Sequence, residues 1–297
     1  MTNVVAEDAS LTSEKSSKKF ILNVKRLNVT NLTTENVAVF LDFDGTLVDF
    51  APSPDAVVVS QALVNDLAQL QQKLDGAIAI VTGREYSILS TLLNVDNMIC
   101  ACEHGSDIVF PSVFDKASQT DGSLPPKTPP SQQVETALQA NASELSQEHQ
   151  TTIRETVNRF ANDLALRSEA KRTSVTLHYR DKPELEATIL AFSETLREQF
   201  PDMDLLKGKC VVEFRFTHKN KGTAIAALMA APPFANRTPV FIGDDVTDEF
   251  GFAEVNKHKG ISIKVGEGET CADHILASVE DVHQFLNALV QTGDVRL

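Results

Sequence analysis

An apolar run over residues 37–41 ends in Asp42-Phe43-Asp44, and a Gly-Thr turn follows at once. Such a run predicts a buried strand, and the two acids then lie at its carboxyl end, the edge where open α/β sheets bind ligands. Carboxylates so close repel each other unless a cation lies between them, which indicates a hard metal ion such as Mg²⁺. One carboxylate could then attack a phosphorus atom and form an aspartyl-phosphate. A plain strand followed by an Asp-Gly turn is the alternative interpretation.

Helix and strand patterns alternate after this motif. A helix is predicted from an N-cap at Ser60 to a stop at Gly76, because leucines recur on one face between them. A second buried strand is predicted at 77–81, followed by a helix at 86–93 and a third strand at 98–102. This order predicts a doubly wound, mostly parallel sheet.

The alternation breaks after the third strand. Residues 111–132 are rich in proline, serine and lysine, which indicates a loop, and a long polar helix is predicted over 132–166. Strict alternation of apolar and polar residues at 174–180 and 210–216 predicts antiparallel strands with one buried face, and a helix is predicted between them at 184–200. This part of the chain is therefore predicted to be an α+β insertion.

The α/β pattern returns with a helix that starts at Lys221. The predicted elements that follow are a strand at 239–242, a helix at 247–255, a strand at 261–265 and a last helix from Ser278, with a capping box to Asp281. The predicted fold class is therefore α/β: a Rossmann-like core with a doubly wound, mostly parallel sheet and an inserted α+β cap domain. The predicted boundaries are a tail at 1–36, the core at 37–111 and 218–297, and the cap at 112–217.

Composition limits the function classes. The 297-residue chain carries a net charge of −14, which argues against nucleic acid as a partner. No long apolar stretch predicts a membrane span, no signal segment is evident and the four cysteines lack metal-site spacing, so we expect a cytoplasmic protein with no membrane partner. An anionic substrate would require local positive charge, and a cluster of basic residues between Arg167 and Lys182 offers it unless that cluster is only a solvated face.

Two further polar groups are predicted at the same sheet edge. Thr82, which follows the second strand, could donate its hydroxyl and its N–H to a phosphate oxygen. Lys221 opens a helix, and its charge adds to the positive end of the helix dipole to form an anion site. Each residue type is common at such a position, so neither is specific by itself.

A dense group of acids follows the strand at 239–242, in the sequence Gly243-Asp244-Asp245-Val246-Thr247-Asp248-Glu249. Acids packed so closely after a buried strand need a cation or many hydrogen-bond donors. We assign Asp244 and Asp245 to the metal, and we expect Asp248 and Glu249 to stabilise the N-terminus of the next helix.

The order of these motifs resembles the haloacid-dehalogenase superfamily of phosphohydrolases. The motifs are Asp-x-Asp-Gly-Thr, Thr-Gly, Lys-Gly and Gly-Asp-Asp, and the insertion resembles that superfamily's mobile cap. The resemblance implies that Asp42 is the nucleophile, and that Asp44 protonates the leaving oxygen and then deprotonates the attacking water. It also implies that Thr82 and Lys221 bind the phosphoryl oxygens, with Lys221 restraining the Asp42 carboxylate.

The resemblance implies a metal site as well. Mg²⁺ would be held by Asp42, the main-chain carbonyl of Asp44 and Asp244, with Asp245 as a further candidate ligand. Phosphoryl transfer needs an in-line nucleophile and neutralised charge on the equatorial oxygens, and these residues would supply both.

Finer matches resemble the trehalose-6-phosphate phosphatase family and cover about residues 37–297. The matching segments are 101–105, 169–171, 174–180, 212–215 and 243–249. The resemblance implies a phosphosugar substrate, trehalose 6-phosphate, whose hydroxyls would be bound by the cap residues Glu169, Lys171 and Glu213. Phe250 and Gly251 depart from the family's usual residues.

Other substrate-binding candidates lie around these residues. Arg84, Glu103 and His104 are predicted at the seam between core and cap, and the remaining candidates are Gly83, His178 and Arg180. His104 could instead be a turn residue, and His178 and Arg180 could simply face solvent.

Two alternative functions are open at this point. A phosphatase for another phosphosugar, such as sucrose phosphate or mannosyl-3-phosphoglycerate, would use the same core. A catalytically silent phosphosugar-binding regulator should have lost Asp42, Asp44, Lys221 or Asp244, and all four are present. The expected partner is a small-molecule phosphosugar, and the expected oligomeric state is a monomer.

Overall fold

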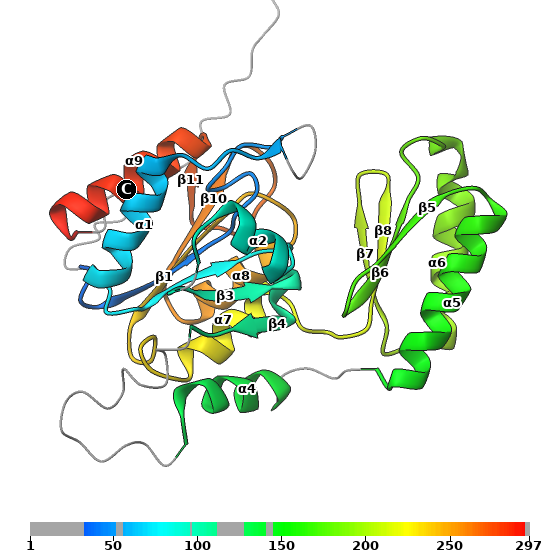
Figure 1. Cartoon of the computed structure of the whole chain (residues 1–297), viewed down its shortest axis with the longest axis horizontal. Helices are drawn as coiled ribbons and strands as arrows, with labels where there is room; N and C mark the ends of the chain where they lie inside the picture. Colours follow the sequence, from blue (N-terminus) through cyan, green and yellow to red (C-terminus); the bar gives the residue numbers. More distant parts are fainter. Residues whose placement is uncertain (1–32, 52–55, 96, 112–127, 141–144, 295–297) are drawn as a thin grey trace, which may run out of the picture.

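The computed structural model describes residues 33–51, 56–95, 97–111, 128–140 and 145–294 (Figure 1). Nearly all of the predicted tail and most of the predicted loop at 111–132 lie outside these residues. The described chain forms a seven-stranded sheet and a separate four-stranded sheet, and each has its own cluster of buried apolar residues.

The seven-stranded sheet has the order β11-β10-β9-β1-β2-β3-β4, and all neighbouring strands in it are parallel except β3 and β4. The central strand β1 (Val37–Leu41) is fully buried between β2 (Ile78–Val81) and β9 (Thr238–Gly243). Strands buried on both faces need continuous apolar runs, as these have. The other strands of this sheet are β3 (Ile99–Cys102), β4 (Asp107–Val109), β10 (Ile261–Val265) and β11 (His274–Leu276).

Helices cover both faces of this sheet (Figure 1). On one side α1 (Gln61–Lys73) packs against α9 (Val279–Thr292), and on the other α7 (Lys221–Met229) packs against α8 (Asp248–Lys257) and α4 (Pro130–Ala140). The short helix α2 (Tyr86–Leu92) connects β2 to β3. Among the described residues, none of the helices combines the length and the apolar character needed to cross a membrane.

Two predicted helix starts are confirmed by their caps. The Ser60 side chain accepts a hydrogen bond from the N–H of Leu63 at the start of α1. Ser278 does the same for Asp281 at the start of α9, and its hydroxyl donates to the Asp281 carboxylate at 2.9 Å. Each cap satisfies an N–H group that the helix leaves unpaired.

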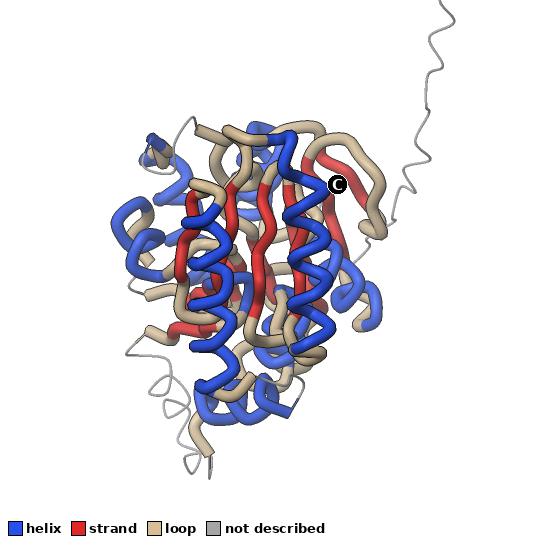
Figure 2. Tube along the Cα trace, turned by 90° about the vertical axis from the view of Figure 1, so that its right-hand side faces the viewer, coloured by secondary structure: helices blue, strands red, loops and turns tan. Residues whose placement is uncertain are grey.

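The four-stranded sheet is antiparallel and has the order β5-β6-β8-β7. Its strands are β5 (Arg167–Ala170), β6 (Ser174–His178), β7 (Asp204–Gly208) and β8 (Val211–Arg215). Figures 1 and 2 show α5 (Gln147–Asp163) and α6 (Glu186–Gln199) side by side on the face that is turned away from the larger sheet. Phe160 and Phe192 stack between these helices, with ring centroids 3.8 Å apart. The free face of the sheet is therefore the one that is turned towards the larger unit.

The predicted α/β fold with an antiparallel insertion is confirmed. Within the described residues, four strands have no counterpart in the prediction: β4, β5, β7 and β11. Each lies at an edge of its sheet, where most of its residues are partly exposed. Edge strands of this kind are short and polar, so they lack the apolar pattern that identifies a buried strand.

The predicted single helix over 132–166 is wrong. α4 ends at Ala140, and α5 starts after a separate N-cap at Ser146. Val134 and Leu138 of α4 belong to the apolar core of the larger unit, although the predicted boundary at residue 112 assigns this helix to the cap. The domain boundaries themselves stay a prediction.

Replacing Val134 tests the attachment of α4 to the larger unit. Because its side chain is fully buried, Val134→Ala is expected to lower the free energy of unfolding by about 1–3 kcal/mol through lost burial and a cavity. Urea unfolding followed by circular dichroism measures the change. Glu135→Ala, on the exposed side of the same helix, is the control and should change it by less than about 0.5 kcal/mol. Equal effects of the two substitutions would contradict this packing.

Candidate active site

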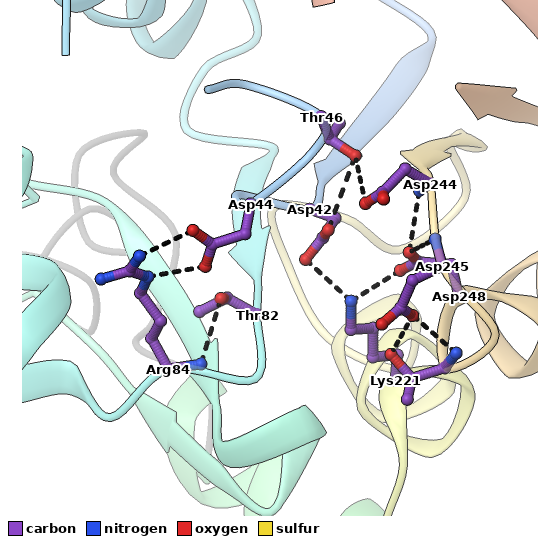
Figure 3. Close-up of polar contacts among 10 residues, drawn as sticks. Asp42, Asp44, Thr46, Thr82, Arg84, Lys221, Asp244, Asp245 and Asp248 are labelled. Carbon is purple, nitrogen blue, oxygen red and sulfur yellow. Dashed lines mark hydrogen bonds and ion pairs between the residues drawn. The ribbon is translucent and has the colours of Figure 1, made fainter. Parts of the chain in front are cut away.

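The loops after β1, β2 and β9 and the first turn of α7 meet at one edge of the seven-stranded sheet (Figure 3). Asp42 and Asp44 follow β1, Thr82 follows β2 and Asp244 follows β9, while Lys221 is the first residue of α7. Parallel strands end at the same edge, so residues far apart in the sequence lie together here. The structure thus brings together the residues that the sequence assigns to the reaction.

Lys221 is buried between two carboxylates. Its Nζ lies 2.7 Å from Asp42 Oδ1 and 2.6 Å from Asp248 Oδ1. Burial by itself would lower the pKa of Lys221, but the negative charges of Asp248 and Asp42 outweigh it and raise the pKa above its usual value. The lysine is therefore charged, and it holds one oxygen of Asp42 in a fixed position.

A capping box fixes the start of α7 and with it the position of Lys221. The Asn220 side chain accepts a hydrogen bond from the N–H of Thr223, and the Thr223 hydroxyl oxygen accepts one from the N–H of Asn220. These reciprocal bonds satisfy N–H groups at the helix terminus. Lys221 therefore extends from a well-defined helix terminus rather than from a loop.

Asp244 reaches the same region because position 45 has no side chain. A Cβ at Gly45 would lie 2.3 Å from Asp244 Oδ2, and Gly45 has a φ of +78°, so both the space and the backbone conformation require glycine. Thr46 Oγ1 lies 3.5 Å from Asp42 Oδ2 and 3.4 Å from Asp244 Oδ1, between the two carboxylates. Carboxylate oxygens of Asp42, Asp244 and Asp248 lie within 4.8 Å of one another.

The crowded carboxylates have raised pKa values. Burial and the charge of Asp248 raise the pKa of Asp42 despite the opposing effect of Lys221. Burial, followed by the charges of Asp248 and Asp245, raises the pKa of Asp244 to about 6. The protein therefore leaves part of this negative charge uncompensated, and Asp42 and Asp244 fit a hard divalent cation with oxygen ligands.

Asp248 belongs to this site, although the sequence predicts only a role at the N-terminus of α8. Its Oδ1 accepts from Lys221, and its Oδ2 accepts from the N–H groups of Asp244 and Asp245, both at 2.9 Å. Both oxygens of Asp248 are thus used to order the lysine and the loop. Asp245, a predicted metal ligand, uses Oδ1 to accept from the N–H and the hydroxyl of Thr247, each at 2.6 Å.

Arg84 holds the side chain of Asp44. Its Nε donates to Asp44 Oδ2 at 2.6 Å and its Nη2 donates to Oδ1 at 2.7 Å, which makes a bidentate ion pair (Figure 3). The N–H of Arg84 donates to Thr82 Oγ1 at 3.2 Å, so the Thr82 hydroxyl keeps its own proton for another acceptor. The sequence predicts Arg84 as a substrate-binding residue at the seam, whereas in this structure its guanidinium contacts the proposed acid.

Glu103 lies at the seam between the two units, where it connects them. Its Oε2 accepts from the N–H of Thr173 at 3.2 Å and from the Thr173 hydroxyl at 2.5 Å. Its Oε1 lies 3.3 Å from Arg172 Nε, and Arg172 also contacts Asp107 at 3.2 Å. The Glu103 carboxylate is therefore engaged by residues of the smaller unit.

His104 lies between Gly83 and Glu213. A Cβ at Gly83 would lie 2.4 Å from the His104 ring, so the glycine provides the space that the ring occupies. His104 Nε2 lies 3.8 Å from Glu213 Oε2, and Glu213 Oε1 accepts from the Ser174 hydroxyl at 2.5 Å. Burial lowers the pKa of His104 to about 4 despite the nearby Glu213 charge, so the ring is neutral at neutral pH.

Glu169 and Lys171 line a cavity of about 390 Å³ together with Asp44 and Arg84. Glu169 pairs with Thr176 across β5 and β6, and Thr176 pairs with Glu213 across β6 and β8. Directly paired residues of an antiparallel sheet lie on the same face. Glu169 and Glu213 therefore lie on the sheet face that is turned towards the core. Lys171, just beyond β5, lines the cavity together with core residues.

His178 and Arg180 line a second cavity, of about 440 Å³, together with Arg167 and Lys182. His178 is connected to the first cavity through Glu169, whose Oε2 lies 3.3 Å from His178 Nε2. Arg180 lines the second cavity and is absent from the lining of the first. The structure thus places Arg180 in a cavity that Asp44 does not line, whereas His178 contacts a residue of the cavity beside Asp44.

Sequence reasoning missed several residues of this region. Asp248, Thr46, Thr173 and Ser174 each hydrogen-bond to a predicted site residue. Asp248 carried a signal, because a buried lysine among several acids can require more than one counter-charge. Thr46 carried one as well, because it ends the Asp-x-Asp-Gly-Thr motif. Thr173 and Ser174 are hydroxyl residues whose partners become evident only in three dimensions.

The chain has the fold of phosphatases of the haloacid-dehalogenase superfamily. A solved phosphatase of this superfamily from Bacteroides thetaiotaomicron covers 88% of the chain and 96% of its own chain, with a TM-score of 0.50 and 16% identity. The solved trehalose-6-phosphate phosphatase of Aspergillus fumigatus covers 87% of the chain and 94% of its own chain, with a TM-score of 0.60 and 24% identity. At these identities the two structures show the likeness of the fold.

Sequence comparison gives the family. A profile of the trehalose-phosphatase family matches residues 40–281. The trehalose-6-phosphate phosphatase of Escherichia coli (strain K12) is 36% identical over 250 residues, which are 84% of this chain and 85% of that protein. The chain therefore belongs to the trehalose-6-phosphate phosphatase family, as the sequence motifs predict.

Divalent ions test the carboxylate site without an activity assay. Because a cation would relieve the repulsion between Asp42 and Asp244, Mg²⁺ is expected to raise the melting temperature, and an ion at a hundredfold excess over its Kd stabilises by about 2.7 kcal/mol. Asp244→Asn should remove most of this shift, and the control Asp181→Asn, on the cap surface, should keep it. The proposed metal site would be contradicted if neither Mg²⁺ nor Mn²⁺ changed the melting temperature, or if Asp244→Asn showed the same shift as the wild type.

Proposed function

We propose that the protein is a Mg²⁺-dependent phosphatase that hydrolyses trehalose 6-phosphate to trehalose and phosphate. The observation that carries this proposal is the buried Asp42–Lys221–Asp248 arrangement beside Asp44 and Asp244, in a chain of the trehalose-6-phosphate phosphatase family. A fixed carboxylate, a fixed cation and an adjacent acid are the groups that phosphoryl transfer through an enzyme carboxylate requires.

Asp42 is the proposed nucleophile. Its carboxylate would form a bond to phosphorus while the bond from phosphorus to the sugar oxygen breaks, which gives an aspartyl-phosphate. Lys221, 2.7 Å from Asp42 Oδ1, orients the carboxylate, and Lys221 and the Thr82 hydroxyl would neutralise charge on the phosphoryl oxygens. Mg²⁺, held by Asp42, Asp244 and the main-chain carbonyl of Asp44, would supply the remaining charge neutralisation.

Asp44 is the proposed acid and base. It would protonate the leaving sugar oxygen and then accept a proton from the water that hydrolyses the aspartyl-phosphate. In this structure both of its oxygens are bound by Arg84, so proton donation requires that one of them is released. We therefore expect Arg84 to turn towards the substrate when it enters, which would couple substrate binding to release of the acid.

The cap is the proposed site of sugar recognition. Glu169 and Glu213 lie on the sheet face that is turned towards the core, and Lys171 lines the cavity beside Asp44. Their carboxylates and amine would hydrogen-bond to sugar hydroxyls. A wrong sugar would leave these groups unpaired, which lowers its affinity. The seam residue Glu103 supports this face through Thr173. His104 Nε2 lies 3.8 Å from Glu213 Oε2, and its buried Nδ1 has no hydrogen-bond partner among the described residues.

The proposal includes two properties that the sequence suggests. We propose that the protein acts as a monomer on a small-molecule phosphosugar, and that it does so in the cytoplasm. Size-exclusion chromatography with light scattering tests the first, and cell fractionation tests the second.

A substrate panel tests the proposed reaction. With Mg²⁺ present, phosphate release is expected to be fastest from trehalose 6-phosphate, compared with sucrose 6-phosphate, glucose 6-phosphate and mannosyl-3-phosphoglycerate. Asp42→Asn should lower kcat by at least about a thousandfold, because it removes the nucleophile. Turnover of several phosphosugars without turnover of trehalose 6-phosphate would overturn the substrate, and unchanged turnover in Asp42→Asn would overturn the mechanism.

Replacing Glu213 tests recognition by the cap. Loss of a charged hydrogen bond to the sugar should make Glu213→Ala lower kcat/KM for trehalose 6-phosphate by about 10- to 100-fold. Turnover of p-nitrophenyl phosphate, which has no sugar hydroxyls, should change far less. The control is Glu198→Ala, an exposed acid on α6, which should leave both substrates unaffected. Equal losses for the two substrates in Glu213→Ala would count against recognition by this residue.

A further inference from the structure

The cavity beside Asp44 has an apolar wall that the proposed reaction does not explain. The cavity of about 390 Å³ is lined on one side by Glu169 and Lys171 of the cap and on the other by residues of the core. The apolar residues among the latter are Phe50, Ala51, Val57 and Ile88. The charged residues Asp44, Arg84 and Glu85 also line the core side, so the sugar-binding candidates of the cap lie opposite a surface that is partly apolar.

Two of these apolar side chains are exposed to solvent, which is energetically unfavourable. Phe50 is 73% exposed and Ile88 is 41% exposed, whereas Val57 is 8% exposed and continues into the core. The described part of the chain exposes five large apolar side chains, and two of them line this one cavity. Scattered exposed apolar residues are ordinary, but two that share the wall of a cavity indicate a surface that a ligand covers.

The position of the wall relative to Asp44 defines which part of a substrate would reach it. Asp44 is the proposed donor of the proton to the leaving oxygen, and it lines the same cavity as Phe50 and Ile88. Asp42 and Asp244 are absent from this lining. The cavity therefore lies on the side of the leaving group rather than on the side of the phosphoryl group.

We infer that Phe50 and Ile88 form a subsite for the apolar C–H face of a pyranose ring in the leaving group. This inference rests on the proposed function. A pyranose has an apolar face of axial C–H groups and an equatorial rim of hydroxyls, so it matches a cavity that is lined both by an apolar patch and by charged hydrogen-bonding groups. Glu169 and Lys171 bind the rim, and Phe50 and Ile88 cover the C–H face. Release of water from both apolar surfaces contributes to affinity. Hydrogen bonds to the sugar hydroxyls contribute less, because they replace hydrogen bonds that the same groups make to water.

Replacing Phe50 tests this subsite. Because the side chain is 73% exposed, its loss does not open a cavity in the core, so Phe50→Ala should keep the wild-type melting temperature. Phe50→Ala is expected to raise KM for trehalose 6-phosphate by about tenfold, with kcat within a factor of about two. Glycerol 2-phosphate, whose leaving group has no ring, should show unchanged kinetics. Phe50→Tyr, which keeps the aromatic face, should have the wild-type KM. Ile88→Gln should raise KM for trehalose 6-phosphate, as Phe50→Ala does.

A matched control separates the subsite from a general effect of aromatic surface residues. Phe250 is 46% exposed on α8 and does not line the cavity, so Phe250→Ala should leave KM unchanged. An unchanged KM in Phe50→Ala, or an equal change for glycerol 2-phosphate, would overturn the subsite.

Failure of the subsite and failure of the proposed function are distinguishable. If wild-type protein hydrolyses trehalose 6-phosphate but Phe50→Ala has the wild-type KM, only the subsite fails. If wild-type protein prefers another phosphosugar, the proposed function fails, and the same variants assayed on that phosphosugar decide the subsite.

Discussion

The site depends on the burial of Lys221 between Asp42 and Asp248. A charged lysine side chain that is only 2% exposed would destabilise the folded protein if it had no partners. The carboxylates of Asp248, at 2.6 Å, and Asp42, at 2.7 Å, compensate its charge. Asp244 lies beside them, and its burial, followed by the negative charges of Asp248 and Asp245, raises its pKa to about 6. In a protein with a net charge of −14, a cation bound at this position would act together with the lysine to let an anionic phosphate ester approach.

The seam between the two units uses the same residues that surround the proposed sugar site. Glu103 accepts from Thr173, and His104 contacts Glu213, which in turn accepts from Ser174. Contacts that hold the small sheet against the larger unit therefore lie next to its proposed recognition face. The proposed recognition would be coupled to the relative position of the two units, because a change in one would displace the partners of the other.

The sequence was sufficient for the central strands and for the residues that follow them. Continuous apolar runs identify β1, β2 and β9 because both faces of these strands are buried, and the acids after β1 and β9 stand where the runs end. The four edge strands were not predicted, because partly exposed strands lack a continuous apolar run. The pairing of Arg84 with Asp44 and the double use of Asp248 depend on side-chain directions in three dimensions, which residue spacing does not determine.

The position of β1 between β2 and β9 has a consequence for the order in which the protein assembles. β1, which the proposed nucleophile Asp42 directly follows, pairs on one side with β2, which comes soon after it in the chain, and on the other with β9, which the ribosome makes only after the whole insertion. Until then a fully apolar strand keeps one edge of unpaired N–H and C=O groups, the kind of edge that invites association between nascent chains. Synthesis of the last third of the chain therefore both closes this edge and completes the charge balance around Asp42.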